Sequence, residues 1–172
     1  MKLTEVMDQA EWRLSKRAAG TLVTLAPDNA DIVHGLINWV KGGFFVQQLE
    51  ATQLLGKTKC QELLDEVVQT LLDLVDGGSG GEESALAVAA VDALAQLGQS
   101  SESVVTKLID IILAGDAADA SSDDVPLQAA ALNAIALMED PPKQLSSLVN
   151  RVLLSSEGLS YMLWEPLSLI HI

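Results

Sequence analysis

Residues 86–98 read LAVAAVDALAQLG, and residues 127–139 read LQAAALNAIALME. The two segments match in length, both begin with Leu and share four alanine positions, and polar residues follow each of them. In both segments apolar residues recur every three or four positions, as they do on the buried face of an amphipathic helix. The segments therefore predict two equivalent helices of a repeating fold.

The same apolar columns can be followed through four stretches of the chain. Each stretch has an apolar anchor, with further columns three, six and eleven residues before it, which places all four side chains on one helix face. Eleven of these twelve preceding positions are apolar, and Thr52 is the exception. The anchors and their columns are Leu25 (Leu22, Ala19, Leu14), Leu55 (Thr52, Leu49, Phe44), Leu97 (Leu94, Val91, Leu86) and Met138 (Ile135, Leu132, Leu127).

A short polar turn and a second apolar stripe follow each anchor. In the first stretch the stripe is formed by Ile32, Val33, Leu36, Ile37 and Val40. The sequence thus predicts a unit of helix, turn and helix that occurs about four times. The units cover about residues 9–41, 43–76, 82–115 and 126–155, with 156–166 as the start of a fifth and with loops rich in Gly, Ser and Asp at 77–84 and 114–126.

With these two segments and this spacing, the chain resembles the HEAT/armadillo class of helical repeat proteins over about residues 9–155. The resemblance implies an all-α fold, an α-α superhelix (HEAT/armadillo-like solenoid) of about four helix pairs. It also implies that the second helices of the pairs line a concave surface that binds a partner segment. The Trp and Asn ladder of peptide-binding armadillo proteins is not repeated, because Asn38 shares its column with Gln69 and Asp110.

The composition of the chain fits one domain with a substantial core, because 49% of its 172 residues are apolar. The formal net charge of −14 is unevenly placed. Residues 1–60 hold seven basic and six acidic residues, whereas residues 61–172 hold three basic and 18 acidic ones. Such a surface disfavours nucleic acid and anionic membranes and attracts basic protein segments. Alternatively, the charge only keeps an apolar protein in solution.

The location expected from the sequence is the cytoplasm. The single cysteine excludes a disulfide framework and suits a reducing compartment. The longest apolar run, residues 85–91, is too short to span a bilayer, and residues 1–12 have no apolar core of a secretory signal.

We therefore expect a non-catalytic protein-protein interaction scaffold without a cofactor, forming part of a longer protein. Its partner would be a basic or mixed-charge protein segment that crosses the outward side chains of the second helices. The candidate partner-binding residues are His34, Asn38, Asp65, Glu66, Gln69, Lys107, Asp110, Asn150 and Arg151, together with Asp31, Glu62, Thr106 and Ser147. These positions are also compatible with an ordinary solvated helix face. The alternative function is that of a HEAT-like repeat enzyme or enzyme accessory related to phycobilin lyases, which would need a pocket with convergent His, Cys or Arg.

A phosphate-binding loop is suggested by residues 51–58, ATQLLGKT, which follow a relaxed Walker A pattern with Ala51 in place of the first glycine. A true loop of this kind follows a buried strand and precedes a helix. Here the segment occupies helical columns, and Gly56 aligns with the turn glycine Gly98. We therefore interpret Gly56 as a helix-ending glycine followed by a polar turn.

No metal site or catalytic constellation is predicted. The acidic stretch with Asp116, Asp119, Asp123 and Asp124 lacks the spacing of an EF-hand loop and reads as a solvated loop. His34 has no partner histidine nearby in the sequence. Cys60 lies beside Lys57 and Lys59, which could activate a thiol, but we interpret it as a structural or incidental cysteine.

The last six residues, 167–172, read LSLIHI and resemble the in-frame translation of a transposon end used in sequencing adapters. We therefore expect a non-native tail at 167–172 and a natural protein that continues beyond the repeat. The alternative is a genuine apolar chain end after Pro166.

Overall fold

The computed structural model describes residues 12–78, 81–98, 101–114 and 125–138, and all regular structure in these ranges is helical. The prediction of an all-α fold is thereby confirmed for the described ranges. The helices are α2 (Trp12–Leu25), α3 (Ala30–Gly42), α4 (Phe45–Leu55), the 3-10 helix η1 (Gln61–Leu63), α5 (Leu64–Gly77), α6 (Gly81–Gln96), α7 (Glu102–Ala114) and α8 (Val125–Ala136).

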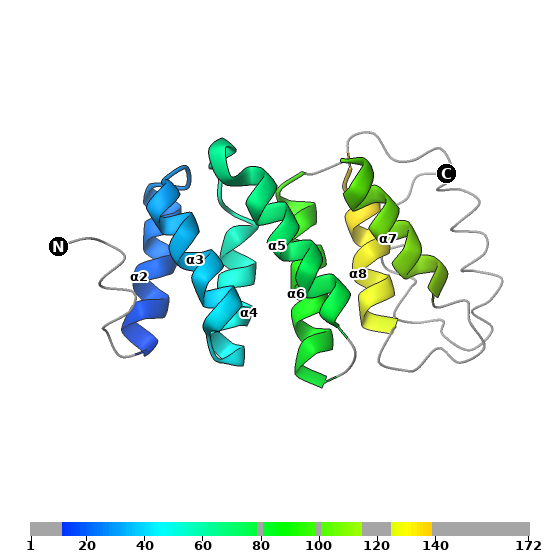
Figure 1. Ribbon diagram of the computed structural model, residues 1–172, viewed down its shortest axis with the longest axis horizontal. Helices are drawn as coiled ribbons and strands as arrows, with labels where there is room; N and C mark the ends of the chain where they lie inside the picture. Colours follow the sequence, from blue (N-terminus) through cyan, green and yellow to red (C-terminus); the bar gives the residue numbers. More distant parts are fainter. Residues whose placement is uncertain (1–11, 79–80, 99–100, 115–124, 139–172) are drawn as a thin grey trace.

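The helices are arranged in two layers (Figure 1). One layer contains α2, α4, α6 and α8, and the other, nearer the viewer, contains α3, α5 and α7. Within the first layer α6 packs against both α4 and α8. Between the layers α3 packs on α4, α5 on α6, and α7 on α8.

The most extensive packing joins helices from neighbouring predicted units. The first unit was expected to pair α2 with α3, yet α3 packs far more extensively on α4 of the next unit. The same holds for α5 and α6. One continuous core results, and its members come from every α-helix between α2 and α8.

The predicted second-helix stripe is confirmed in α3, where all five of its apolar residues are buried. The polar exception among the first-helix columns, Thr52, is also fully buried. Its hydroxyl donates to the Gln48 carbonyl oxygen at 2.8 Å, so burial leaves no unsatisfied polar group.

Three residues expected in the core are exposed instead: Leu14 (59%), Leu25 (76%) and Phe44 (82%). Leu14 and Leu25 lie on α2, which among the described helices packs mainly on α4 and α3. Phe44 precedes the first residue of α4, so it lies outside the helix whose periodicity placed it in the core. The backbone N–H of Phe44 donates to Gln47 Oε1 at 3.1 Å and so starts that helix.

The first predicted loop is shorter than expected. α5 continues to Gly77, and α6 begins at Gly81. Glu82 and Glu83 therefore lie in the first turn of α6, where their negative charges interact favourably with the helix dipole. Outside the described residues lie most of the second loop, the second helix expected for residues 126–155, the fifth unit at 156–166 and the tail at 167–172.

Candidate functional site

The described residues among those predicted to face a partner lie on the layer formed by α3, α5 and α7, or on η1 beside it. Seven of them fall in the described ranges: His34, Asn38, Asp65, Glu66, Gln69, Lys107 and Asp110. Lys107 is half-buried and the other six are exposed, as are Asp31, Glu62 and Thr106. Asn150, Arg151 and Ser147 lie outside the described residues.

The most acidic part of this layer is the segment of η1 and α5. We call it the acidic row, and its members are Glu62, Asp65, Glu66, Asp73 and Asp76, all of them exposed. Asp65, Gln69, Asp73 and Asp76 follow one another at helical spacing, and Gln69 Nε2 donates to Asp73 Oδ1 at 2.8 Å. Asp73 and Asp76 were not among the predicted residues, although extending the same spacing by two turns would have found them.

Lysines from the neighbouring helices reach this row from both sides. Lys41 Nζ of α3 lies 3.7 Å from Glu66 Oε1, and Lys107 of α7 pairs with Asp76. Exposed ion pairs of this kind contribute only about 0–1 kcal/mol to stability. A basic partner could therefore replace either lysine at little cost to the fold.

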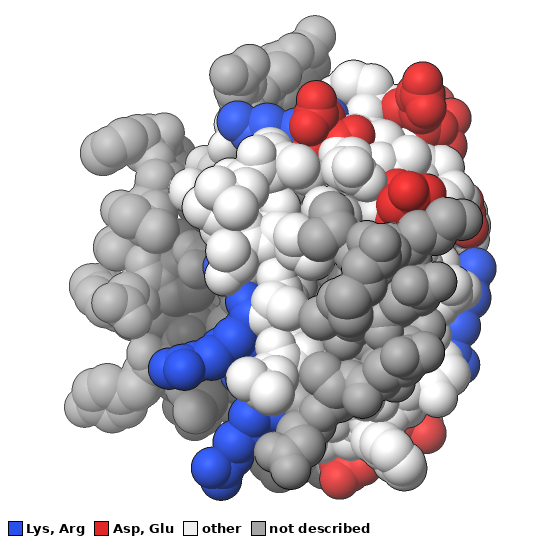
Figure 2. Space-filling view, turned by 90° about the vertical axis from the view of Figure 1, so that its left-hand side faces the viewer, with Lys and Arg blue, Asp and Glu red and all other residues white. Residues whose placement is uncertain are grey.

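Basic side chains predominate at the other end of the described chain. Figure 2 looks at this end and shows Lys and Arg atoms protruding at the lower left, while acidic atoms gather at the upper right. α2 carries Arg13, Lys16 and Arg17, which are exposed. Lys16 Nζ is held by Glu50 Oε2 of α4 at 2.7 Å.

The Walker-like segment forms the end of helix α4 and the turn after it, and the backbone N–H groups of this turn are already hydrogen-bonded. The backbone N–H groups of Lys57 and Thr58 donate to the carbonyls of Leu54 and Leu55 at 3.0 and 3.1 Å. The N–H of Lys59 donates to the Pro27 carbonyl at 2.7 Å. Because a phosphate loop uses such amides to wrap its ligand, this turn is not built as one.

Gly56 and Gly98 differ in the reason for which each position needs glycine. Gly98 has a φ of +65°, the left-handed conformation typical of a helix end. Gly56 has a right-handed φ of −61°, but a Cβ there would lie 2.8 Å from Ala93 Cα of α6. The prediction that Gly56 ends a helix and precedes a turn is confirmed, because α4 ends at Leu55 and Gly56 caps it. Gly56 allows the end of α4 to approach α6 closely.

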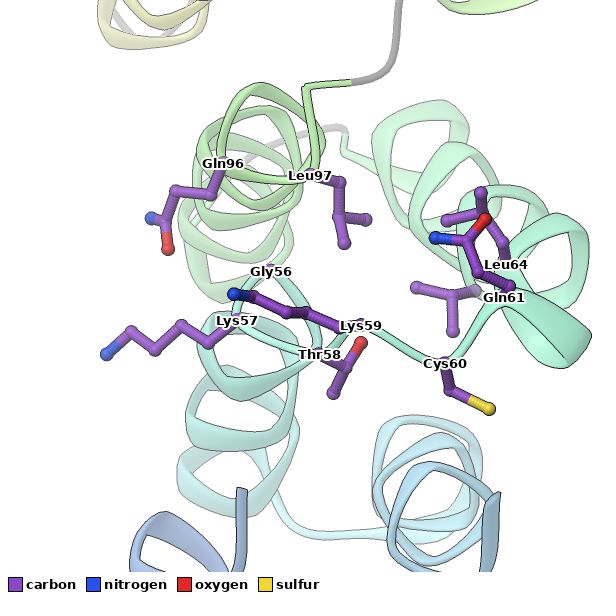
Figure 3. A pocket seen from close by; sticks show the side chains of 10 residues that line it. Gly56, Lys57, Thr58, Lys59, Cys60, Gln61, Leu64, Gln96 and Leu97 are labelled. Atoms are coloured by element: carbon purple, nitrogen blue, oxygen red, sulfur yellow. The ribbon is translucent and has the colours of Figure 1, made fainter. Parts of the chain in front are cut away.

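This close approach forms one wall of a cavity of about 480 Å³ between the α4–η1 turn and the end of α6 (Figure 3). We call it the lysine cavity. Its lining residues are Gly56, Lys57, Thr58, Lys59, Cys60, Gln61, Leu64, Val67, Gln96 and Leu97. The side chains of Lys57, Lys59 and Gln96 extend to the same side in Figure 3, and Gln61 lies across the cavity.

A second hollow of about 390 Å³ adjoins the lysine cavity along α4 and α6 and shares Lys57 and Gln96 with it. Its apolar lining includes Leu49 and Val88, and its one carboxylate is Asp92. Burial raises the pKa of the Asp92 carboxyl above its ordinary value. Sequence reasoning missed this arrangement because its residues lie on segments far apart in the chain.

The remaining candidates show no site. Within the described ranges no group of three or more His, Cys, Asp or Glu side chains could hold a metal ion. His34 is exposed on α3, and Cys60 is buried at the start of η1. Most of the acidic loop at 114–126 lies outside the described residues.

The described part of the chain contains no helix that is both long and apolar enough to cross a membrane. Comparison of the whole chain with models of known protein families, with curated proteins and with solved structures gave no match. Its function must therefore be argued from the acidic row and the cavities.

Proposed function

We propose that the chain is a HEAT/armadillo-like scaffold that binds a partner protein on the layer of α3, α5 and α7 and catalyses no reaction. The two layers and the core shared between successive units support the repeat architecture, because stacked helix pairs bury their apolar faces in this way. The acidic row is the observation that carries the proposal. It places five exposed carboxylates on one segment of the layer.

The partner is a basic or mixed-charge protein segment. Among the described residues, Glu62 and Asp65 have no basic group within ion-pair distance, so two carboxylates of the row are available directly. Glu66 and Asp76 become available when Lys41 and Lys107 are displaced. The acidic surface disfavours nucleic acid and anionic membranes as partners. We further propose a cytoplasmic location, which the free thiol of Cys60 supports.

The test measures the fluorescence anisotropy of a labelled basic peptide, Lys-Arg-Leu-Lys-Arg, during titration with the chain. Reversing two charges of the row with Asp65→Lys and Glu66→Lys should weaken binding about tenfold or more. Raising the salt concentration should weaken binding to the unmodified chain, since the attraction is screened.

The matched control is Asp28→Lys with Glu82→Lys, which changes the net charge equally at exposed positions outside α3, α5 and α7. Glu82, like Asp65 and Glu66, lies in the first turn of a helix, whereas Asp28 precedes α3, so the control reproduces one of the two lost helix-dipole interactions. Equal weakening by both variants would mean that only net charge matters, and would refute the proposed site.

A further inference from the structure

The lysine cavity holds the two described lysines that have no carboxylate partner. Of the five lysines in the described ranges, Lys16, Lys41 and Lys107 each lie within ion-pair distance of a carboxylate. Lys57 and Lys59 do not, and both line this cavity. In a chain with a net charge of −14, two unpaired ammonium groups at one cavity are unexpected.

The other residues that line the cavity are partly apolar and partly able to form hydrogen bonds. Leu64, Val67 and Leu97 contribute apolar atoms, while the amides of Gln61 and Gln96 can donate hydrogen bonds. The Thr58 hydroxyl is already used, because it donates to the Leu55 carbonyl at 2.7 Å. A volume of about 480 Å³ is in the range of sites that take a few residues of a peptide or a small ligand.

We propose that the lysine cavity binds a short acidic segment of a partner protein. Carboxylates of the segment pair with Lys57 and Lys59, and an apolar side chain beside them packs on Leu64 and Leu97. The lysine cavity lies at a different place from the acidic row, and its ligand carries the opposite charge. It does not rest on the function proposed above.

A phosphate ligand fits this geometry less well than a carboxylate segment. Phosphate sites on helical turns use free backbone N–H groups, and the N–H groups of Lys57, Thr58 and Lys59 already donate to carbonyls. Lysine ammonium groups that act without such a cradle pair readily with side-chain carboxylates. The apolar part of the lining adds selectivity for a segment that carries a Leu or similar residue.

Three acidic side chains lie near the lysine cavity without lining it. Glu62 and Asp65 are on the adjoining segment but do not line the cavity. Asp92 lines the second hollow, which shares Lys57 with the cavity, and is more than 4.0 Å from the Lys57 ammonium. At neutral pH the Asp92 carboxylate would oppose an acidic ligand, so Asp92→Asn should strengthen binding of that ligand.

The experiment titrates the chain into a fluorescein-labelled peptide, Glu-Asp-Leu-Glu-Glu, and follows anisotropy. Lys57→Gln with Lys59→Gln should weaken binding about tenfold. The matched control Lys16→Gln with Lys41→Gln removes the same charge elsewhere and should change binding by less than about twofold. Equal weakening by the two variants, or no binding to the unmodified chain, overturns the proposal.

A second measurement locates the peptide. In ¹⁵N-labelled chain the acidic peptide should shift the amide signals of residues 57–61 and 96–97. Shifts confined instead to α2, where Arg13 and Arg17 form the competing basic surface, overturn the proposal. Displacement of the peptide by equal concentrations of ATP or inorganic phosphate overturns it as well, because the site would then be a general anion site.

Discussion

The acidic row and the lysine cavity are joined at η1 and α5, yet they are built in different ways. The row consists of exposed side chains on one continuous segment, and its two ion pairs are solvent-exposed contacts to neighbouring helices. The cavity depends on the close approach of α4 to α6 at Gly56 and Ala93. The comparison indicates that the row can change without affecting the fold, whereas the cavity cannot.

The largest effect is expected from Gly56→Val. Its Cβ would lie 2.8 Å from Ala93 Cα, so α4 and α6 must move apart, at a cost of about 1–3 kcal/mol in unfolding free energy. The acidic peptide should also lose affinity, because the cavity wall moves. Urea denaturation measures the first effect and anisotropy the second.

The matched change in the acidic row is Gln69→Ala, at an exposed helix position. It should change the unfolding free energy by less than about 0.5 kcal/mol. If Gln69→Ala proved as destabilising as Gly56→Val, the contrast between the two regions would be wrong.

Gly98→Ala should have an intermediate effect. The φ of +65° disfavours any side chain, although nothing lies within 4 Å of the added Cβ. The expected loss in urea denaturation is about 1 kcal/mol. A loss as large as that of Gly56→Val would mean that the close contact with α6 at Gly56 costs no more than the backbone conformation at Gly98.

Asp92→Asn should produce a smaller, pH-dependent change. Burial raises the pKa of Asp92, so the folded chain holds the proton more tightly than the unfolded chain does. The stability that the protonated carboxyl contributes is therefore fully present below the unfolded pKa. It is lost as the pH rises through the folded pKa, because the carboxylate is then partly buried with its charge. The variant should therefore be more stable than the unmodified chain at pH 7, by at most about 0.5 kcal/mol for this partly exposed group. Below pH 3 the two chains should unfold alike. A variant that is less stable at pH 7 would contradict the assigned cause.

The smallest effect is expected at the edge of the acidic row. Lys41→Met removes the exposed ion pair with Glu66 and should change the unfolding free energy by about 0.3 kcal/mol or less. It should strengthen binding of the basic peptide about twofold, because Glu66 no longer has to exchange partners. Weaker binding would show that Lys41 itself contacts the peptide.

How much the sequence could predict depended on whether a feature was local. The buried stripe of α3 followed from helical spacing alone, and the exposure of Asp65, Glu66 and Gln69 followed from the same spacing. Phe44 was misplaced because apolar spacing does not reveal where a helix begins.

Features formed between distant segments were not predictable in this way. Lys57 and Gln96 line the same cavity only because Gly56 meets Ala93, and no periodicity reveals that contact. The alignment of Gly56 with Gly98 correctly indicated that Gly56 ends a helix, but not why each position needs glycine. Only the packing around each glycine distinguishes a conformational requirement from a steric one.

The central claim is that two surfaces of opposite charge act independently, and a crossed titration tests it most directly. The basic and acidic peptides are each titrated against the Asp65→Lys, Glu66→Lys variant and the Lys57→Gln, Lys59→Gln variant. The account predicts that the first variant weakens only the basic peptide and the second weakens only the acidic peptide, each about tenfold. If each variant alters the affinities of both peptides in the way its change in net charge predicts, the two sites do not exist as described.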